Sequence, residues 1–202
     1  MAISLTGVFG GTFDPPHLGH LILASEALSQ LGLERLLWVL TPDPPHKPSQ
    51  PITPLPQRLE MLRLALSDEP RFEICEIEIG RPGPHYTVET LRQLKAANPA
   101  SELVYLMGGD SLRDLPNWRD PAEIIRQCHA LGVMRRPYDA VDLTALEKIL
   151  PGISAKVRLV DVPLLEIASS QVRQRVAANQ SFRYYLHPRV YDYILATGLY
   201  RS

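Results

Sequence analysis

Two histidines stand three residues apart in the stretch GVFGGTFDPPHLGHL, shortly after a pair of glycines. The apolar run before Gly10 and Gly11 predicts a strand, and the residues from about Leu18 onward predict a helix. Such a turn points free backbone N–H groups and the positive end of the helix toward one spot, which suits a phosphate. His17 and His20 would share the first-turn face of the helix, where both could donate hydrogen bonds to the phosphate as it reacts.

The same two histidines could instead act only as helix caps or core residues. We favour the phosphate interpretation because both lie on one helix face beside a glycine turn. Two familiar phosphate motifs do not fit, since the stretch lacks the G-K-[ST] ending of the P-loop and the glycine spacing of the dinucleotide fingerprint.

Short apolar runs alternate with helical patterns along the chain, which predicts an α/β fold with a mostly parallel sheet and helices on both faces. We expect strands at 3–9, 35–40, 71–79, 102–108, 129–134 and 156–162. We expect helices at about 18–31, 55–67, 86–97, 120–127 and 142–150, and two more that begin near Ser169 and after the HP pair at 187–188. Open parallel sheets bind ligands at the carboxyl ends of their strands, so polar residues there are the candidates for a site.

Length and charge limit the class of protein. With 202 residues and a net charge of −1, we expect one domain over 1–202 whose last part, about 164–202, is helical. The small net charge gives no reason to expect nucleic acid or a membrane surface as a partner, so phosphate binding must be local. No basic and apolar leader and no membrane-length apolar run is present, and Cys75 and Cys128 lack metal-ligand spacing. These features predict reduced, buried thiols and a cytoplasmic protein.

Two further stretches place polar groups at the same predicted edge. The stretch YLMGGDSL runs from a strand into a turn and carries Asp110, which would either hold a ribose hydroxyl or cap the next helix. In IASSQVR, either Ser169 or Ser170 opens a helix, and Arg173 lies one turn further along. This second helix end, with a guanidinium added, is able to bind an anion.

The proline-rich segment 41–56 is too long for a simple connection, which favours a functional loop. It carries His46 and Lys47, although a single loop lysine is usually only solvated. Trp118, between LPN and RD, offers a flat face to an aromatic ring or else packs against its own loop.

The stretch GGTFDPPHLGH resembles the GxFxPxHxGH signature of the nucleotidyltransferase superfamily, whose members transfer a nucleotidyl group from a nucleoside triphosphate. Six further stretches, in order along nearly the whole chain, are similar to the bacterial nicotinate-nucleotide adenylyltransferase family: PHK, RLEMLRLA, YTVETL, LMGGDSLRDLPNW, IASSQVR and YDYILATGLY. The resemblance implies a Rossmann-like, doubly wound fold. It also implies transfer of the adenylyl group of ATP to nicotinate mononucleotide, which gives nicotinate adenine dinucleotide and pyrophosphate in NAD biosynthesis.

The resemblance implies roles for individual residues as well. The catalytic residues would be His17, His20 and Arg173. ATP would be bound by Gly10, Gly11, Thr12, Phe13, His17, His20, Gly108, Asp110, Ser169, Ser170 and Arg173. Nicotinate mononucleotide would be bound by His46, Lys47, Thr87, Trp118 and Arg119. Mg²⁺, held mainly by the ATP phosphates, would screen the triphosphate, so no dense carboxylate cluster is expected.

Two positions depart from the family's pattern. Ala168 stands where the commoner form of the motif has serine, which removes one hydroxyl but leaves the helix end and Arg173 in place. Arg119 follows Trp118 where relatives often carry tyrosine, so recognition there is expected from the backbone N–H group.

The sequence offers no Ser-His-Asp or Cys-His pattern for a covalent intermediate, and none is needed because the acceptor phosphate is itself a nucleophile. Two alternatives stay open. The first is another adenylyl- or cytidylyltransferase with the same signature, such as the pantetheine-phosphate enzyme, which would need a different acceptor pocket. The second is a nucleotide-binding sensor without catalysis. The oligomeric state is left open.

Overall fold

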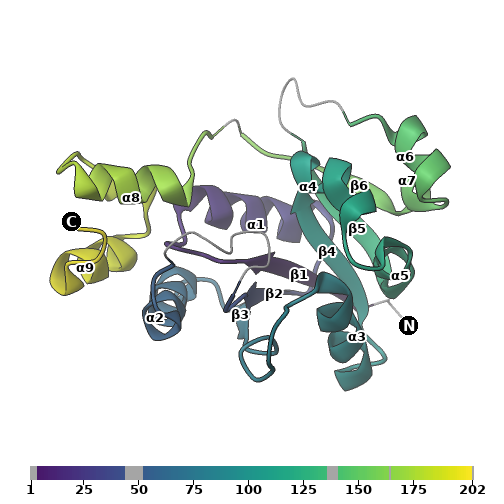
Figure 1. The fold of residues 1–202 in the computed structure, drawn as a ribbon, viewed down its shortest axis with the longest axis horizontal. Coiled ribbons are helices and arrows are strands. Elements are labelled where there is room, and N and C mark those ends of the chain that lie inside the picture. Colours follow the sequence, from purple (N-terminus) through teal and green to yellow (C-terminus); the bar gives the residue numbers. More distant parts are fainter. Residues whose placement is uncertain (1–3, 44–51, 136–140, 164, 202) are drawn as a thin grey trace.

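The computed structural model describes residues 4–43, 52–135, 141–163 and 165–201. At its centre lies a six-stranded sheet in the order β3-β2-β1-β4-β5-β6, with every neighbouring pair parallel (Figure 1). The strands are β1 (Leu5–Gly11), β2 (Arg35–Leu40), β3 (Phe72–Cys75), β4 (Glu102–Gly108), β5 (Cys128–Arg135) and β6 (Val157–Asp161). This is the strand order of a doubly wound, Rossmann-like sheet, which confirms the expected fold class.

The strand order reverses between β1 and β4. From β1 the chain adds β2 and then β3 on one side, and it later crosses back to add β4, β5 and β6 on the other. A crevice opens beyond the carboxyl ends of the strands at such a switch point, because the connections leave in opposite directions. β1 ends at Gly11 and β4 at Gly108, so both glycines stand at this crevice.

Side chains alternate between two apolar clusters, one on each face of the sheet. On β2, Trp38 belongs to one cluster, whereas its neighbours Leu37 and Val39 belong to the other. The first cluster is covered by α1 (Leu18–Gln30), α2 (Leu55–Leu66), α8 (Ser169–Ala177) and α9 (Pro188–Thr197). The second is covered by α3 (Thr87–Ala97), α4 (Gly109–Asp114), α5 (Pro121–Gln127), α6 (Leu143–Ile149) and α7 (Ile153–Lys156).

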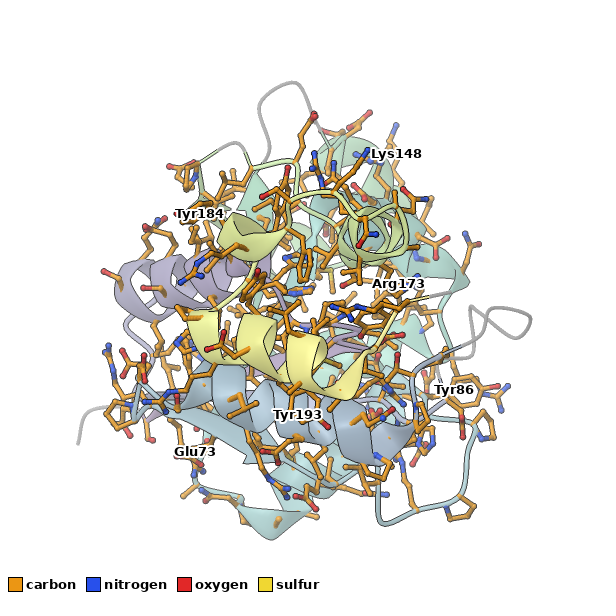
Figure 2. All side chains as sticks on the ribbon, turned by 90° about the vertical axis from the view of Figure 1, so that its left-hand side faces the viewer. Glu73, Tyr86, Lys148, Arg173, Tyr184 and Tyr193 are labelled. Carbon is orange, nitrogen blue, oxygen red and sulfur yellow. The ribbon has the colours of Figure 1, made fainter. Side chains whose placement is uncertain are left out.

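The helices expected at the end of the chain lie together at one end of the molecule (Figure 1). α9 packs against α2, and Figure 2 looks at this end with Arg173 of α8 labelled. α9 begins at Pro188, where the side chain of His187 accepts from the backbone N–H of Arg189. It ends at Thr197, and the next residue, Gly198, has a left-handed φ of 69°, a conformation that glycine adopts without steric cost.

The strand expected at 71–79 is shorter than predicted. β3 is an edge strand that pairs with β2 over Phe72–Cys75, and the chain turns at 77–80. There the carboxylate of Glu78 accepts a hydrogen bond from the Thr90 hydroxyl, so the chain leaves the sheet although its apolar alternation continues. A second difference follows the helix expected at 142–150, where an additional short helix, α7, precedes β6.

Candidate active site

A cleft of about 950 Å³ opens at the switch point between β1 and β4. It is lined by the ends of these two strands and by the first turns of α1, α4 and α8. The cleft brings together most of the predicted site residues: Gly10, Gly11, Phe13, His17, His20, Gly108, Asp110, Trp118, Ser169, Ser170 and Arg173. Among the described residues, Thr12, Thr87 and Arg119 do not line it, and His46 and Lys47 lie outside the described residues.

His17 and His20 stand at the start of α1 with their rings stacked and the ring centroids 3.6 Å apart. His17 is the N-cap residue, and its Nδ1 accepts from the backbone N–H of His20 at 3.4 Å. In return, Nδ1 of His20 accepts from the backbone N–H of His17 at 3.2 Å. The capping and the phosphate interpretations are therefore compatible, because capping uses Nδ1 and leaves Nε2 of each ring for a ligand in the cleft.

Both imidazoles are held neutral by their surroundings. Burial lowers the pKa of His17 to about 4. Burial and the neighbouring His17 hold the pKa of His20 well below its ordinary value of 6.5. The rings of Phe9 and Phe13 pack against His20, at centroid distances of 6.0 and 5.2 Å, while the residue still borders the cleft. With Nδ1 accepting, a neutral ring carries its proton on Nε2 and donates from there.

Glycine at position 11 leaves room for the aromatic ring of Phe13. Phe13 has a left-handed backbone with a φ of 46°, and its ring packs edge-on against Phe9 at 5.5 Å. A Cβ atom at Gly11 would lie 2.8 Å from Cζ of Phe13, closer than real Cβ contacts allow. Glycine at this position therefore lets the ring lie under the end of β1.

α8 presents its first turn to the same cleft. Its N-cap, Ala168, makes no side-chain capping bond, as expected where serine is replaced. The hydroxyl of Ser169 donates to the carbonyl of Pro15 at 2.9 Å, and Nη1 of Arg173 donates to the carbonyl of Asp14 at 2.7 Å. These bonds join α8 to the signature loop, residues 10–17, and so fix the helix end and the guanidinium relative to the histidines.

Asp110 does not cap the helix that it opens. The N-cap of α4 is Gly108, without a side-chain bond, so the capping interpretation of Asp110 is wrong. Its exposed carboxylate accepts from Arg113 at 3.3 Å at the border of the cleft. Exposed ion pairs contribute only about 0–1 kcal/mol, so a ribose hydroxyl could compete for this carboxylate.

Tyr105 links the cleft to the start of α3. Its ring meets Trp118 edge to face at a centroid distance of 6.2 Å, and its hydroxyl lies 3.5 Å from Oγ1 of Thr87. Burial raises the pKa of Tyr105 to about 12, so the hydroxyl keeps its proton. Thr87 is the first residue of α3, whose N-cap Tyr86 makes no side-chain capping bond. No sequence pattern singles out Tyr105, because it lies inside an apolar strand.

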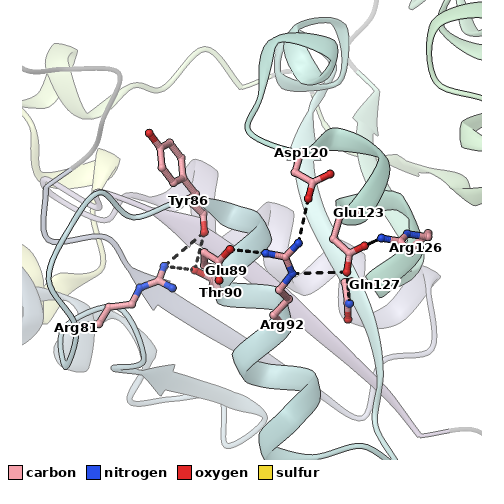
Figure 3. A network of polar contacts seen from close by, with 9 residues as sticks. All are labelled: Arg81, Tyr86, Glu89, Thr90, Arg92, Asp120, Glu123, Arg126 and Gln127. Atoms are coloured by element: carbon pink, nitrogen blue, oxygen red, sulfur yellow. Dashed lines mark hydrogen bonds and ion pairs between the residues drawn. The ribbon is translucent and has the colours of Figure 1, made fainter.

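A polar network holds α3 and α5 together beside this end of the cleft (Figure 3). Arg92 of α3 pairs with Glu89, with Glu123 of α5 at 3.6 Å and with Asp120, the residue after Arg119, at 3.0 Å. The guanidinium carbon of Arg119 lies 6.0 Å from the ring centroid of Tyr86. The exposed side chain of Arg119 therefore lies beside the residue that precedes α3, although it does not line the cleft.

Arg58 is a structural residue that the sequence did not single out. It is only 2 % exposed and donates to four backbone carbonyls, at 2.7 to 3.0 Å. The acceptors are Thr12, Thr41, Pro42 and Thr53. The carbonyl of Thr12 thus accepts a structural hydrogen bond from Arg58. The expected contact between Thr12 and ATP stays a prediction.

The structure also describes possible metal-binding clusters, possible membrane-spanning helices and the two cysteines. Across the described residues, no group of three His, Cys, Asp or Glu side chains could hold a metal ion. No helix of the described chain is long and apolar enough to cross a membrane. Both cysteines are free; Cys128 is buried, which raises the pKa of its thiol to about 12, but Cys75 is only half-buried, contrary to expectation.

Residues 8–175 match the cytidylyltransferase-like family. Over 200 residues, the chain is 46% identical to a protein of Thermomicrobium roseum described as a probable nicotinate-nucleotide adenylyltransferase, with 99% of this chain and 93% of that protein covered. The chain belongs to the nicotinate-nucleotide adenylyltransferase family. A Roseiflexus castenholzii protein of the same description is 43% identical over 201 residues, with 100% of both chains covered. The family and the enzyme class expected from the sequence are confirmed.

Solved structures of this enzyme family share the fold. Nicotinic acid mononucleotide adenylyltransferase of Plasmodium falciparum, complexed with NaAD, superposes with a TM-score of 0.81. Its sequence is 20% identical, and the match covers 98% of this chain and 97% of that one. The same Plasmodium falciparum enzyme complexed with APC gives a TM-score of 0.78.

Proposed function

We propose that this adenylyltransferase family member transfers the adenylyl group of ATP to nicotinate mononucleotide and releases nicotinate adenine dinucleotide and pyrophosphate, a reaction of NAD biosynthesis. One observation carries the proposal: two neutral imidazoles and the start of α8 with Arg173 border one cleft beside the glycines of β1. The names of full-length relatives support the choice of substrates.

ATP lies with its triphosphate between the starts of α1 and α8. Nε2 of His17 and of His20 donates to the α-phosphate, while Arg173 and the first-turn N–H groups of α8 hold the β- and γ-phosphates. The remaining contacts come from Gly10, Gly11, Thr12, Phe13, Gly108, Asp110, Ser169 and Ser170. Among these, Gly108 and Asp110 seat the adenosine at the end of β4.

The reaction needs alignment and charge stabilisation rather than a covalent intermediate. A phosphate oxygen of the acceptor attacks the α-phosphorus of ATP, and the bond from that phosphorus to the oxygen bridging to the β-phosphate breaks. The bonding electrons leave with pyrophosphate, and no proton has to move. The two Nε2–H donors stabilise charge on the α-phosphate, and Arg173 stabilises charge on the leaving group.

Mg²⁺ fits this site as an ion bound mainly by substrate. It would supply positive charge to the triphosphate, taking most of its ligands from phosphate oxygens and water.

The acceptor lies toward Trp118 and the start of α3. Trp118 offers a ring face to the pyridine, and the first-turn N–H groups of α3 near Thr87 favour a negative carboxylate. Arg119 adds a positive charge beside the same helix end. His46 and Lys47 keep the role that the resemblance implies, as secondary contacts of nicotinate mononucleotide near the reacting phosphates.

Pyrophosphate release from ATP and Mg²⁺, measured with a panel of acceptors, tests the proposal. The panel is nicotinate mononucleotide, its amide and pantetheine phosphate. The amide would bring an NH₂ group against N–H donors, a mismatch of about 1–3 kcal/mol per buried group. We expect kcat/KM for the acid to exceed that for the amide by at least ~100-fold if two such groups are affected. Preference for pantetheine phosphate, or ATP binding without turnover, would establish one of the two alternatives.

We also propose a domain organisation and a cellular location for this protein. The two core clusters on one continuous sheet support a single nucleotidyltransferase domain over residues 1–202, with a helical part from about 164. A cytoplasmic location accords with two free thiols. No nucleic-acid or membrane partner is assigned.

A further inference from the structure

Tyr200, after α9, contacts the signature loop across 186 positions of sequence. Its hydroxyl donates to Oδ1 of Asp14 at 2.7 Å. Asp14 is only 4 % exposed, and its Oδ2 accepts from the backbone N–H of Thr53 at 3.1 Å. The main-chain carbonyl of the same aspartate accepts from Arg173 at 2.7 Å. Asp14 therefore connects the signature loop with the stretch before α2, with α8 and with the stretch after α9.

The backbone is strained on both sides of this connection. Phe13, directly before Asp14, has a φ of 46°, and Tyr200 has a φ of 65°. A non-glycine residue in the left-handed region is sterically unfavourable and persists only where the surrounding contacts determine it. The hydrogen bond to Asp14 is such a contact for Tyr200.

The protonation state of Tyr200 agrees with the geometry of the hydrogen bond. Burial, together with the charge of Asp14, raises the pKa of Tyr200 above its ordinary value. The phenol therefore keeps its proton near neutral pH and donates a hydrogen bond to the carboxylate of Asp14.

We propose that Tyr200 is a positioning residue for the ATP side of the active site, acting on Arg173 through Asp14. The proposal rests on the proposed function, because that function assigns Arg173 to the triphosphate. Tyr200 touches no substrate itself. It holds the Asp14 carboxylate, and the carbonyl of that residue in turn orients the guanidinium of Arg173.

Loss of the hydroxyl would leave one oxygen of a buried carboxylate without this donor. The aspartate would then shift toward other partners or water, and its carbonyl would move with it. Displacement of a positioning group by a fraction of an ångström is enough to weaken binding of the group that it aligns. α3, which is proposed to bind the acceptor, lies toward the opposite end of the molecule from α9 and the stretch after it (Figure 1).

The test is steady-state kinetics of Tyr200→Phe, with ATP and nicotinate mononucleotide varied in turn. Tyr184→Phe is the matched control, because Tyr184 is 82 % exposed and lies in the same C-terminal part. We expect Tyr200→Phe to raise the KM for ATP about fivefold and to change the acceptor KM by less than about twofold. Tyr184→Phe should change neither. Calorimetric titration of each folded variant with a non-hydrolysable ATP analogue should show the same difference in Kd.

A purely structural role predicts a different result: a lower Tm and a smaller active fraction, hence lower apparent kcat, with both KM values unchanged. That result would overturn the proposal. A double-mutant cycle with Arg173→Ala tests whether Tyr200 acts on ATP binding through Arg173. Tyr200→Phe should add no further increase in ATP KM to Arg173→Ala, and a full additional fivefold increase would overturn the route through Arg173.

The cycle also separates this inference from the proposed function. If Arg173→Ala raises the KM of the acceptor instead of ATP, the assignment of Arg173 to the triphosphate fails. If Arg173→Ala behaves as proposed and Tyr200→Phe matches the wild type, only the inference about Tyr200 fails.

Discussion

Nδ1 of His17 and Nδ1 of His20 each accept a hydrogen bond from the backbone N–H of the other residue. A nitrogen that accepts cannot carry the proton, so this pairing fixes the tautomer of both rings. The start of α1 thus selects Nε2–H as the group that each histidine presents to a ligand. Helix capping and phosphate recognition depend on the same pair of backbone bonds.

The first prediction follows from the neutral state of these rings. Because burial lowers the pKa of His17 to about 4 and that of His20 well below 6.5, neither ring loses a proton between about pH 6.5 and 8.5. We expect kcat at saturating substrates to stay nearly constant over this range. A pH–rate profile checks it: a tenfold fall per pH unit above 6.5 would mean that an imidazolium is required.

The second prediction concerns stability and uses His17→Asn. Asparagine is a favourable N-cap residue, so the variant should keep the start of α1. In the wild type the folded-state pKa of His17 lies below its unfolded value of 6.5. The stabilisation from keeping His17 neutral is therefore complete above about pH 6.5 and is lost as the pH falls toward 4.

Denaturant unfolding at several pH values measures this effect. Between about pH 6.5 and 4, the free energy of unfolding should fall more steeply in the wild type than in His17→Asn, by up to about 1.4 kcal/mol per pH unit. Parallel curves for the two proteins would contradict the lowered pKa. Turnover of His17→Asn should still be poor, because the Nε2–H donor is gone.

The third prediction is that His20→Ala lowers kcat by on the order of 100-fold or more, since one preorganised donor to developing charge is lost. The variant also loses its half of the capping box, which costs about 1 kcal/mol of stability and should leave the fold intact. Circular dichroism supplies the control for folding. Near-normal turnover in the folded variant would remove His20 from the site.

The part of the site that could be predicted from sequence is the part built locally. His17 and His20 are three residues apart beside a glycine turn, and the helix geometry alone brings them to one face. Arg173 was found in the same way, one turn after a helix start. In each case the motif and the element that positions it are contiguous, so no tertiary information was needed.

Long-range contacts gave no such signal. The bond between Tyr200 and Asp14 spans 186 positions, and Arg58 donates to carbonyls in three separate stretches of the chain. The strand expected at 71–79 is longer than β3 because a local pattern does not show long-range contacts. Its alternating pattern continues through Glu78, and only the tertiary bond to Thr90 shows that this residue has left the sheet.

The fourth prediction assigns Arg173 to ATP. Its Nη1 bond to Asp14 places the guanidinium at the cleft beside the start of α8, on the side proposed for the triphosphate. Arg173→Ala should raise the KM for ATP by about tenfold or more, while the acceptor KM changes little. Arg175→Ala is a suitable control, because Arg175 lies on the same helix but contacts Tyr185 and the carbonyl of Ser181.

The last prediction concerns Arg119 and the choice between acid and amide. The guanidinium lies 6.0 Å from the ring centroid of Tyr86, beside the start of α3, which has no side-chain cap and where the carboxylate of the acceptor is proposed to bind. A positive charge there stabilises the acid but not the neutral amide. Because the arginine does not line the cleft, its interaction with the acceptor carboxylate is screened. We expect it to favour binding of the acid over the amide by about 1 kcal/mol, similar to the effect of the helix end itself.

Arg119→Gln should therefore lower the ratio of kcat/KM for acid over amide by about three- to tenfold, mainly through the KM of the acid. Arg119→Lys, which keeps the charge, should retain most of the ratio. Arg71→Gln is the control for a general change in net charge, since Arg71 pairs with Glu69 on the surface. An unchanged ratio in Arg119→Gln would mean that backbone N–H groups alone select the acid, whereas equal losses in Arg119→Gln and Arg119→Lys would point to packing on Tyr86 instead of charge.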